Sequence, residues 1–214
     1  MHLIQAVLFD FGKVLTLSPN QAAWQRMQDV SGLPEAELSD GYWALRDDYD
    51  AGLFTGDTYW TRIAGKPLSD EQRHLLKEAD VDLWTDMNEP MLAWVGRLHA
   101  SGFRTGILSN MPDSMAEGIC ERFDWIANFD HTVWSHALKL RKPDAAIYRA
   151  AVDGLSVPAA EILFIDDKEE NTLAAKDAGM QAITYHDHDS FVEEMQRRGW
   201  GHLLDTGTHL AANL

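Results

Sequence analysis

Apolar residues recur along the chain in short runs that predict β-strands. Such runs lie at residues 3–9, 104–108, 131–135, 161–165 and 181–185, each bounded by polar or turn-forming residues. Short runs rich in Val, Ile, Leu and Phe are typical of strands that are buried inside a sheet. We therefore predict a β-strand in each of these ranges.

Helix signals separate the later strands. Helices are expected from Pro112 onward, from Pro143 to Asp153, from Asn171 to Ala178 with Gly179 as the stop, and at Ser190 with Glu193 in a capping box. Alternating strands and helices indicate a parallel sheet that helices cover on both faces. The predicted fold class is α/β, with a doubly wound, mostly parallel sheet.

The pattern is helical only between Ser18 and Thr85. Helix starts are predicted at Ser18 to Gln21, at Ser39, near Asp57 and at Ser69 with Gln72, and Gly32 ends the first helix. We expect residues 18–85 to form a small all-helical domain inserted after the first strand, and residues 1–17 and 86–214 to form the α/β core. Most aromatic residues of the helical block are expected to fill its interior, with one or two facing the cleft between the domains.

Charge and cysteine content narrow the function classes. The 214 residues carry 18 Lys and Arg against 34 Asp and Glu, for a formal net charge of −16. This charge repels phosphate backbones and anionic lipid, so no nucleic acid or membrane partner is expected. The one cysteine, Cys120, cannot form an internal disulfide; it is expected to lie in a helix and to serve as a packing residue. With no leader or bilayer-spanning run apparent, we expect a cytoplasmic protein; a monomer and a weak homodimer both stay open.

Polar residues with unusual chemistry follow the apolar runs. They are Asp10, Ser109 with Asn110, Lys142 before Pro143, and the pair Asp166 and Asp167. Ligands of open parallel sheets bind at the carboxyl ends of the strands. A carboxylate nucleophile, a metal-binding acid, a hydroxyl and a fixed cation together suit phosphoryl transfer. Taken singly, each has a simpler explanation as a turn cap, an ordinary turn or a surface charge. The order and spacing of all of them is the stronger signal.

The segments VLFDFGKVL, ILSN, LRKPDAAIY and ILFIDDKEENTLAAKDAGM resemble, in order, the sequence motifs of the haloacid dehalogenase superfamily. The match runs from Leu3 to about Tyr185, and the helical block lies where that superfamily has its cap domain. The DFGKV opening and the paired acids followed by Asn171 are similar to the branch of sugar-phosphate phosphatases that act on glucose 1-phosphate, and to the phosphatase domain fused to soluble epoxide hydrolase.

The resemblance implies a role for each motif residue. Asp10 forms an aspartyl-phosphate and binds Mg²⁺, with the Gly12 carbonyl and Asp167 as the further metal ligands. Ser109 and the amide of Asn110 hold phosphate oxygens, and Lys142 neutralises charge on Asp10 and the transferring group. Asp166 and Asn171 support the metal acid from behind. The implied function is a Mg²⁺-dependent phosphatase acting on a small phosphorylated metabolite, such as an anomeric sugar 1-phosphate.

Gly12 departs from the pattern, because most phosphatases of this superfamily have a general acid and base Asp at that position. Losing a general acid typically costs about a hundred- to ten-thousand-fold in rate. Gly12 is explained either by a left-handed backbone or by a close approach of the cap. Two alternatives to the phosphatase stay open, namely a metal-independent 2-haloacid dehalogenase and a catalytically weak metabolite-binding module.

Three other features need an interpretation. Arg46 is expected to form a surface ion pair with Asp50, or else to reach over as an anchor for substrate. The HDHD run at 186–189 is expected to be a polar loop rather than a transition-metal site. Residues 205–214 are expected to form a loose tail.

Overall fold

The structure is a computed structural model that describes residues 3–205. Its centre is a five-stranded sheet in the order β3-β2-β1-β4-β5. The strands are β1 (Ala6–Phe9), β2 (Arg104–Ser109), β3 (His131–Trp134), β4 (Ile162–Asp166) and β5 (Gln181–Thr184), and every neighbouring pair is parallel. The predicted parallel sheet is confirmed, and each strand lies within one residue of its predicted range except β1, which begins at Ala6.

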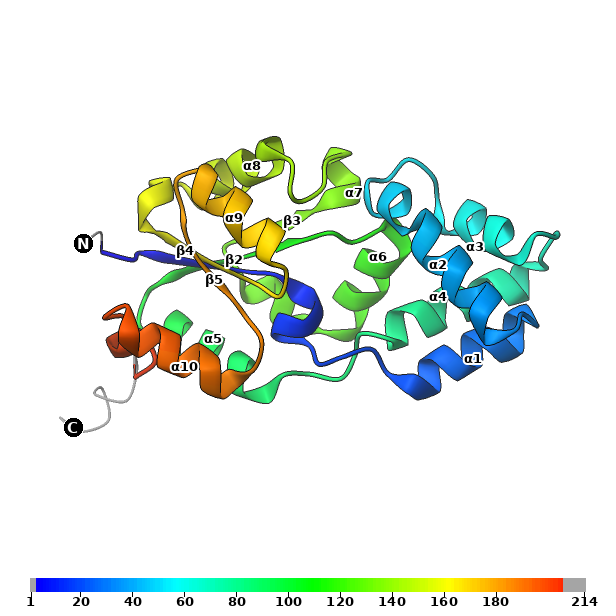
Figure 1. Cartoon of the computed structure of the whole chain (residues 1–214), viewed down its shortest axis with the longest axis horizontal. Coiled ribbons are helices and arrows are strands. Elements are labelled where there is room, and N and C mark those ends of the chain that lie inside the picture. The colour runs from blue at the N-terminus through cyan, green and yellow to red at the C-terminus, as the bar shows by residue number, and fades with distance from the viewer. Residues whose placement is uncertain (1–2, 206–214) are drawn as a thin grey trace.

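Helices cover both faces of the sheet, as the alternating pattern predicts (Figure 1). One face packs against α5 (Glu89–Ala100), α6 (Asp113–Arg122) and α10 (His188–Arg197), and the other against α8 (Ala145–Leu155) and α9 (Glu169–Asp177). Successive strand residues point to opposite faces. In β1, Val7 and Phe9 therefore enter the first hydrophobic cluster, while Ala6 and Leu8 enter the second.

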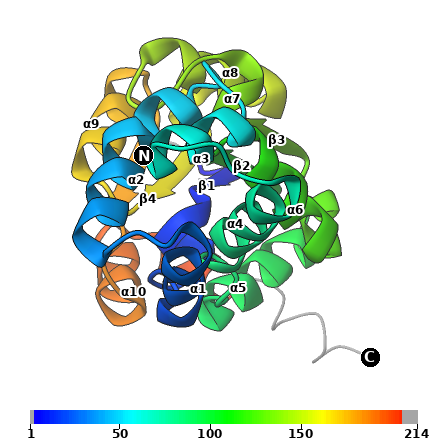
Figure 2. The ribbon, with the colours of Figure 1, turned by 90° about the vertical axis from the view of Figure 1, so that its right-hand side faces the viewer.

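Four helices fill the segment between β1 and α5. They are α1 (Gln21–Ser31), α2 (Glu35–Asp50), α3 (Gly56–Ala64) and α4 (Asp70–Asp82). They pack around a hydrophobic cluster of their own, in which Tyr42, Tyr49, Tyr59 and Trp60 are fully buried. Figure 2 shows these helices side by side in front of the sheet. We keep the predicted boundary for this unit and call residues 18–85 the cap.

The remaining elements are short. A tight turn, η1 (Phe11–Leu15), follows β1, and α7 (Ser135–Leu138) follows β3. Single turns of 3₁₀ helix lie at Asp124–Asn128, Ala159–Glu161 and Gly201–Leu203. Both η1 and α7 lie just beyond the carboxyl ends of their strands, which is the edge of the sheet where the polar motifs were found.

Several helix boundaries differ from the predictions. No helix starts at Ser39, because α2 already begins after Pro34 with Glu35 and Glu37 in its first turn, where acids favour the helix dipole. Asn20 rather than Ser18 caps α1. The capping box at Ser190 is wrong, since Asp187 caps α10 by accepting from the Ser190 N–H at 2.8 Å. The capping box of Ser69 and Gln72 is confirmed.

Two further expectations need correction. Helix α5 was not predicted at all. Cys120 lies in α6 as expected, but its side chain is exposed rather than packed against neighbouring residues. The 186–189 run is split, with His186 and Asp187 exposed and α10 beginning at His188. Of the expected tail, residues 206–214 lie outside the described residues.

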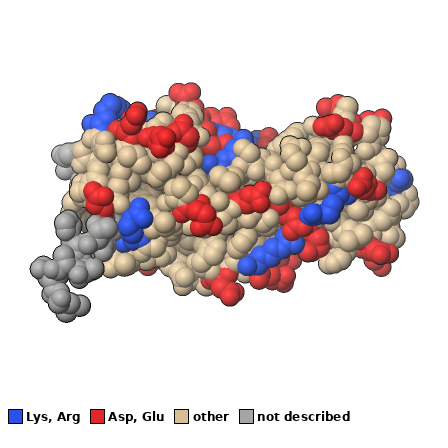
Figure 3. Space-filling view, turned by 90° about the horizontal axis from the view of Figure 1, so that it is seen from below, with Lys and Arg blue, Asp and Glu red and all other residues tan. Residues whose placement is uncertain are grey.

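The surface carries scattered acidic side chains, with basic ones in small groups beside them (Figure 3). Exposed pairs such as Arg26 with Asp82 and Arg122 with Glu78 account for part of this arrangement. Within residues 3–205, none of the helices combines the length and the apolar character that crossing a membrane requires.

Candidate active site

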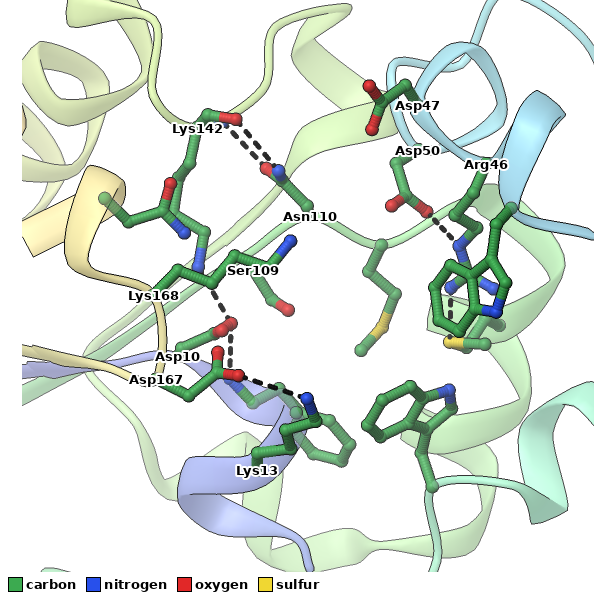
Figure 4. Close-up of a pocket in the computed structure, with 17 residues that line it drawn as sticks. Asp10, Lys13, Arg46, Asp47, Asp50, Ser109, Asn110, Lys142, Asp167 and Lys168 are labelled. Carbon is green, nitrogen blue, oxygen red and sulfur yellow. Dashed lines mark hydrogen bonds and ion pairs between the residues drawn. The ribbon is translucent and has the colours of Figure 1, made fainter. Parts of the chain in front are cut away.

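The carboxyl ends of the central strands and the cap enclose one pocket of about 240 Å³ (Figure 4). The sheet side contributes Asp10, Ser109, Asn110, Lys142 and Asp167, which follow different strands in the sequence. The parallel order brings them together because β2, β1 and β4 are adjacent and end at the same edge. The cap side contributes Trp43, Arg46, Asp47, Asp50 and Trp84.

Asp10 follows β1 directly and caps the turn η1. Its Oδ1 accepts from the Phe11 N–H at 2.7 Å and lies 2.9 Å from the Lys142 Nζ. Burial raises the pKa of Asp10 to about 6 against the lowering effect of Lys142. Asp10 therefore fits both explanations, the turn cap and the nucleophile. The hydrogen bond from the Phe11 N–H fixes a desolvated carboxylate at the floor of the pocket.

Lys142 is a buried cation between two carboxylates. Its side chain is almost fully buried, and its Nζ lies 2.6 Å from Asp166 Oδ2 as well as beside Asp10. Burial alone lowers the pKa of a lysine, but the neighbouring Asp10 and Asp166 carboxylates raise the pKa of Lys142 above its ordinary value. Lys142 therefore stays charged, which contradicts the simpler explanation of a solvated surface lysine.

The two adjacent acids have different surroundings. Asp166 is fully buried, and its oxygens accept from Lys142, from the Asn171 Nδ2 at 2.9 and 3.1 Å and from the Lys168 N–H at 2.8 Å. Asp167 instead lines the pocket, with its Oδ2 3.5 Å from the Lys13 Nζ. This difference supports the predicted division, in which Asp167 is the acid that faces a metal and Asp166 positions its neighbours.

The donor set fits a hydrated Mg²⁺ ion. Asp10, Asp166 and Asp167 each offer an oxygen, and these oxygens lie within 4.8 Å of one another. The Oδ1 of Asn171, a residue that lines the pocket, is buried and has no hydrogen-bond partner among the described residues. Mg²⁺ prefers a few carboxylate oxygens and keeps several waters, which could donate to such an orphaned oxygen.

Ser109 and Asn110 lie at the end of β2 on the wall of the pocket. The Asn110 side chain is committed to the backbone of Lys142, with Oδ1 accepting from its N–H at 2.8 Å and Nδ2 donating to its carbonyl at 3.0 Å. The Asn110 side chain is therefore not free for the predicted phosphate contact, which leaves its backbone N–H as the candidate donor. Its side chain has a role that the sequence did not indicate, which is to anchor the segment that carries Lys142.

Gly12 has an ordinary backbone, with φ −65° and ψ 130°. The left-handed explanation is wrong for this residue; Lys13 is the one with positive φ, at 59°. The close-approach explanation is supported, because a Cβ at Gly12 would lie 3.2 Å from the Trp84 ring of the cap. Gly12 thus leaves room for an indole close to Asp10.

Gly12→Asp should restore a candidate acid if leaving-group protonation is what the enzyme lacks. The native protein should then favour aryl over alkyl phosphates strongly, and the variant should raise the ratio of alkyl to aryl turnover, up to about a hundredfold. The ratio is measured on native and variant proteins of matched thermal stability. Gly12→Ala is the control, since it adds the Cβ against Trp84 without a carboxyl. A native enzyme indifferent to the leaving group would contradict the prediction.

Arg46 forms the predicted ion pair with Asp50, at 2.7 Å, but the pair is buried rather than on the surface. Its guanidinium also contacts Asp80 at 3.3 Å and the Tyr42 hydroxyl, and its Nη2 lies 3.4 Å from the Met115 sulfur in α6. Burial raises the pKa of the Asp50 carboxyl to about 6 and also raises the pKa of Asp80. The cap wall of the pocket is therefore a desolvated charge network.

Sequence reasoning missed several residues of the pocket. Lys13 and Lys168 were part of the recognised motifs without a role, and Asp47 had no signal because it is an ordinary helix-surface acid in sequence. Trp43, with 54% of its area exposed, and Trp84 are the aromatic residues that face the cleft, as expected of one or two of them. Their position on the cap could not be separated from that of the buried aromatics by spacing alone.

Relatives with known names match most of the chain. Bifunctional epoxide hydrolase 2 from Sus scrofa is 26% identical over 95% of this chain, which spans only 40% of that protein's length. A phosphoglycolate phosphatase from Xanthomonas campestris is 27% identical, covering 86% of this chain and 83% of the relative. (S)-2-haloacid dehalogenase 1 from Pseudomonas sp. is 27% identical, covering 77% of both.

A HAD family enzyme from Bacteroides thetaiotaomicron has the same fold, with a TM-score of 0.75 at 20% identity over 90% of this chain and 98% of the other. That enzyme has also been solved in complex with magnesium and inorganic phosphate. Residues 4–179 match the family described as haloacid dehalogenase-like hydrolases, a range that includes Asp10, Lys142, Asp166 and Asp167. The motifs, the sheet order and this match agree, and the chain belongs to the haloacid dehalogenase-like hydrolase family.

Proposed function

We propose that this hydrolase is a Mg²⁺-dependent phosphatase. The observation that carries the proposal is the meeting of Asp10, Lys142 and Asp167 at one pocket, together with the unpartnered Asn171 oxygen. A buried lysine beside the nucleophile and a pocket-facing acid that can bind a cation suit a transition state that spreads negative charge over phosphoryl oxygens. The phosphoglycolate phosphatase relative and the magnesium and phosphate complex of the fold neighbour support the same reaction.

The chain's own residues perform a two-step displacement. An Asp10 oxygen attacks phosphorus, the bond from phosphorus to the ester oxygen breaks, and its electron pair leaves with the alcohol. Water then attacks the aspartyl-phosphate and releases a proton to solvent, the bond from phosphorus to Asp10 breaks, and inorganic phosphate departs with a free carboxylate left behind. Lys142 stabilises Asp10 and the transferring charge throughout. The proton for the leaving oxygen comes from solvent, because Gly12 offers none.

Asp10, Asp167 and the Gly12 carbonyl would hold the metal, with Asp166 and Asn171 behind them. Bound there, Mg²⁺ supplies positive charge that offsets the charge on the phosphoryl oxygens. Ser109 and the Asn110 N–H would hold the remaining phosphate oxygens. The assignment of these residues is a proposal that rests on their place in the pocket.

The substrate we favour is a small phosphorylated metabolite, and among these an anomeric sugar 1-phosphate. Such an ester has a better leaving group than a simple alkyl phosphate, which suits a site without an acid at Gly12. The acidic composition and the single cysteine support a reducing, cytoplasmic setting with neither nucleic acid nor membrane as partner.

A 2-haloacid dehalogenase is the second candidate. The glycine at residue 12 favours it, and so does the dehalogenase relative. The pocket-facing Asp167 disfavours this function. An acid beside the Asp10 carboxylate repels a carboxylate substrate unless these acids bind a metal.

Chelating the metal should abolish the hydrolysis of an aryl phosphate, and added Mg²⁺ should restore it. The reason is that Asp10 and Asp167 repel an approaching phosphate dianion when no cation is bound. Phosphate release is measured with and without chelator, and chloride release from 2-chloropropionate is measured beside it. Full phosphatase activity in chelator, or faster turnover of the chloroacid, would contradict the proposal.

A further inference from the structure

The wall of the pocket that faces the sheet edge is acidic. It is formed by the end of α2, where Asp47 and Asp50 both line the cavity (Figure 4). The lysines of the pocket, Lys13, Lys142 and Lys168, all come from the α/β core and lie on the phosphate side. A substrate with its phosphate at Asp10 must therefore extend its alcohol portion toward these cap carboxylates.

Asp50 offers an open acceptor to that alcohol portion. Its Oδ1 accepts from the Arg46 Nε at 2.7 Å, and no group of the described residues donates to its Oδ2. Figure 4 shows that the oxygen not bonded to Arg46 is turned toward the interior of the pocket. Asp50 is buried, with 8% of the residue exposed, and its backbone carbonyl accepts from the Ser135 hydroxyl of the α/β core. The acceptor is thus fixed in place before any ligand arrives.

Arg46 lines the same wall, but neighbouring carboxylates already match its positive charge. Its Nε and Nη1 donate to Asp50, Asp80 and the Tyr42 hydroxyl, and its Nη2 contacts the Met115 sulfur. Asp50 alone matches its charge, and Asp80 is a further acid whose Oδ2 is buried without a partner. Asp47 is paired with Arg141 at 3.1 Å, so that cation is also matched. The cap wall has no unmatched positive charge among the described residues.

We propose that the phosphate ester cleaved here has a leaving alcohol that bears hydrogen-bond donors and no acidic group, and that Asp50 selects it. This inference rests on the proposed phosphatase function. A hydroxyl or an ammonium can donate to Asp50, whereas a carboxylate on the alcohol meets a fixed like charge with no cation to relieve it. The indole of Trp43 lines the same space and suits the C–H faces or a cationic group of such an alcohol.

The inference separates this chain from its phosphoglycolate phosphatase relative, because phosphoglycolate carries the carboxylate that the cap wall disfavours. Phosphoglycolate, 2-hydroxyethyl phosphate and 2-aminoethyl phosphate are close in size and differ in the charge at the far end. We expect kcat/KM in Mg²⁺ buffer at neutral pH to be about tenfold or more higher for the hydroxyl or amino compound than for phosphoglycolate. The order of these two shows whether the donor is a hydroxyl or an ammonium.

An aryl phosphate in the same assay distinguishes a failure of the proposed selectivity from a failure of the phosphatase assignment. If the aryl phosphate is hydrolysed and phosphoglycolate is the best of the three alkyl esters, the selectivity is wrong and the phosphatase assignment stands. If none of the esters is hydrolysed, the phosphatase assignment fails and the inference fails with it. The native protein decides both questions without any variant.

Asp50→Asn tests the residue. The amide oxygen can still accept from Arg46, while the charge at the pocket wall is removed. We expect the ratio of kcat/KM for 2-hydroxyethyl phosphate to that for phosphoglycolate to fall about tenfold. Asp48→Asn is the matched control, because Asp48 is exposed on the same helix, outside the pocket, and loses the same charge. An unchanged ratio in folded Asp50→Asn protein would overturn the role of Asp50.

The same ratio should depend on pH in the native protein. The groups that face Asp50 are Arg46, Asp47 and Asp80, and the Asp50 carboxyl has a pKa of about 6. Below pH 6 this carboxyl is neutral, so the repulsion of phosphoglycolate weakens and the ratio falls as pH falls. The ratio in Asp50→Asn should be low and flat across the same range; a parallel pH dependence in the variant counts against the inference.

Discussion

Asp10→Asn should lower the turnover of an aryl phosphate by about ten-thousandfold or more, because an amide does not attack phosphorus. The substitution keeps the shape of the side chain, and its oxygen can still accept from the Phe11 N–H and from Lys142. The variant is therefore expected to fold and to keep the pocket. Phosphate release and formation of a beryllium fluoride adduct are the measurements, and both should be lost.

Asp177→Asn is the control for this experiment. Asp177 is exposed at the end of α9, so its loss removes one charge without touching the pocket. Turnover by Asp10→Asn comparable to that of the native protein would show that Asp10 is only a ligand or a turn cap, and the displacement mechanism would then be wrong.

Lys142→Met should lower both activity and stability. It leaves the buried carboxylates of Asp10 and Asp166 without their shared cation. Removing one partner of a buried ion pair typically costs about 3–5 kcal/mol of unfolding free energy. We expect a loss of that size when the protein is unfolded by denaturant in metal-free buffer. In Mg²⁺ buffer, we expect the turnover of an aryl phosphate to fall about a thousandfold or more. Lys176→Met, on the exposed side of α9, should change neither.

The sign of the pH dependence gives a second check on Lys142→Met. Without the lysine, burial keeps the pKa of the Asp10 carboxyl raised, so its ionised form destabilises the fold. The stability deficit should therefore shrink as pH falls and Asp10 takes up a proton. The double variant Lys142→Met with Asp166→Asn should recover part of the stability and none of the activity. A deficit that does not depend on pH would point to lost packing instead.

The sheet could be predicted from the sequence because its strands are buried on both faces. A strand such as β4 is then a continuous apolar run that ends at a polar residue, and the strand end and the candidate site are found together. Helix α5 was not predicted, although Asn88, Pro90 and the apolar spacing to Ala100 are ordinary helix signals. Ser39 misled because serine is also tolerated inside a helix that Pro34 and two acids have already started.

The residues that come directly from β1, β2 and β4 could be placed in the site by position. Their chemical environment could not, because it depends on contacts between distant segments. The sequence does not show that Asn110 holds the Lys142 backbone or that Arg46 is buried with Asp80. The cap wall was the least predictable part, since its acids belong to a helix whose exposed and inward faces carry the same residue types.

The central place of β1 has a consequence for how the protein forms. β1 precedes both of its neighbours in the sequence, and these begin only at Arg104 and Ile162. Pairings between segments so far apart are slow to form, because the intervening chain must lose its freedom before any strand contact is gained. During synthesis, β1 has no neighbouring strand on either side until β2 and β4 have been made. Unpaired apolar strands of this kind are prone to aggregate. Asp10 therefore gains its surroundings only after β4 has left the ribosome, and a chain that stops before residue 162 should fail to keep β1 in solution.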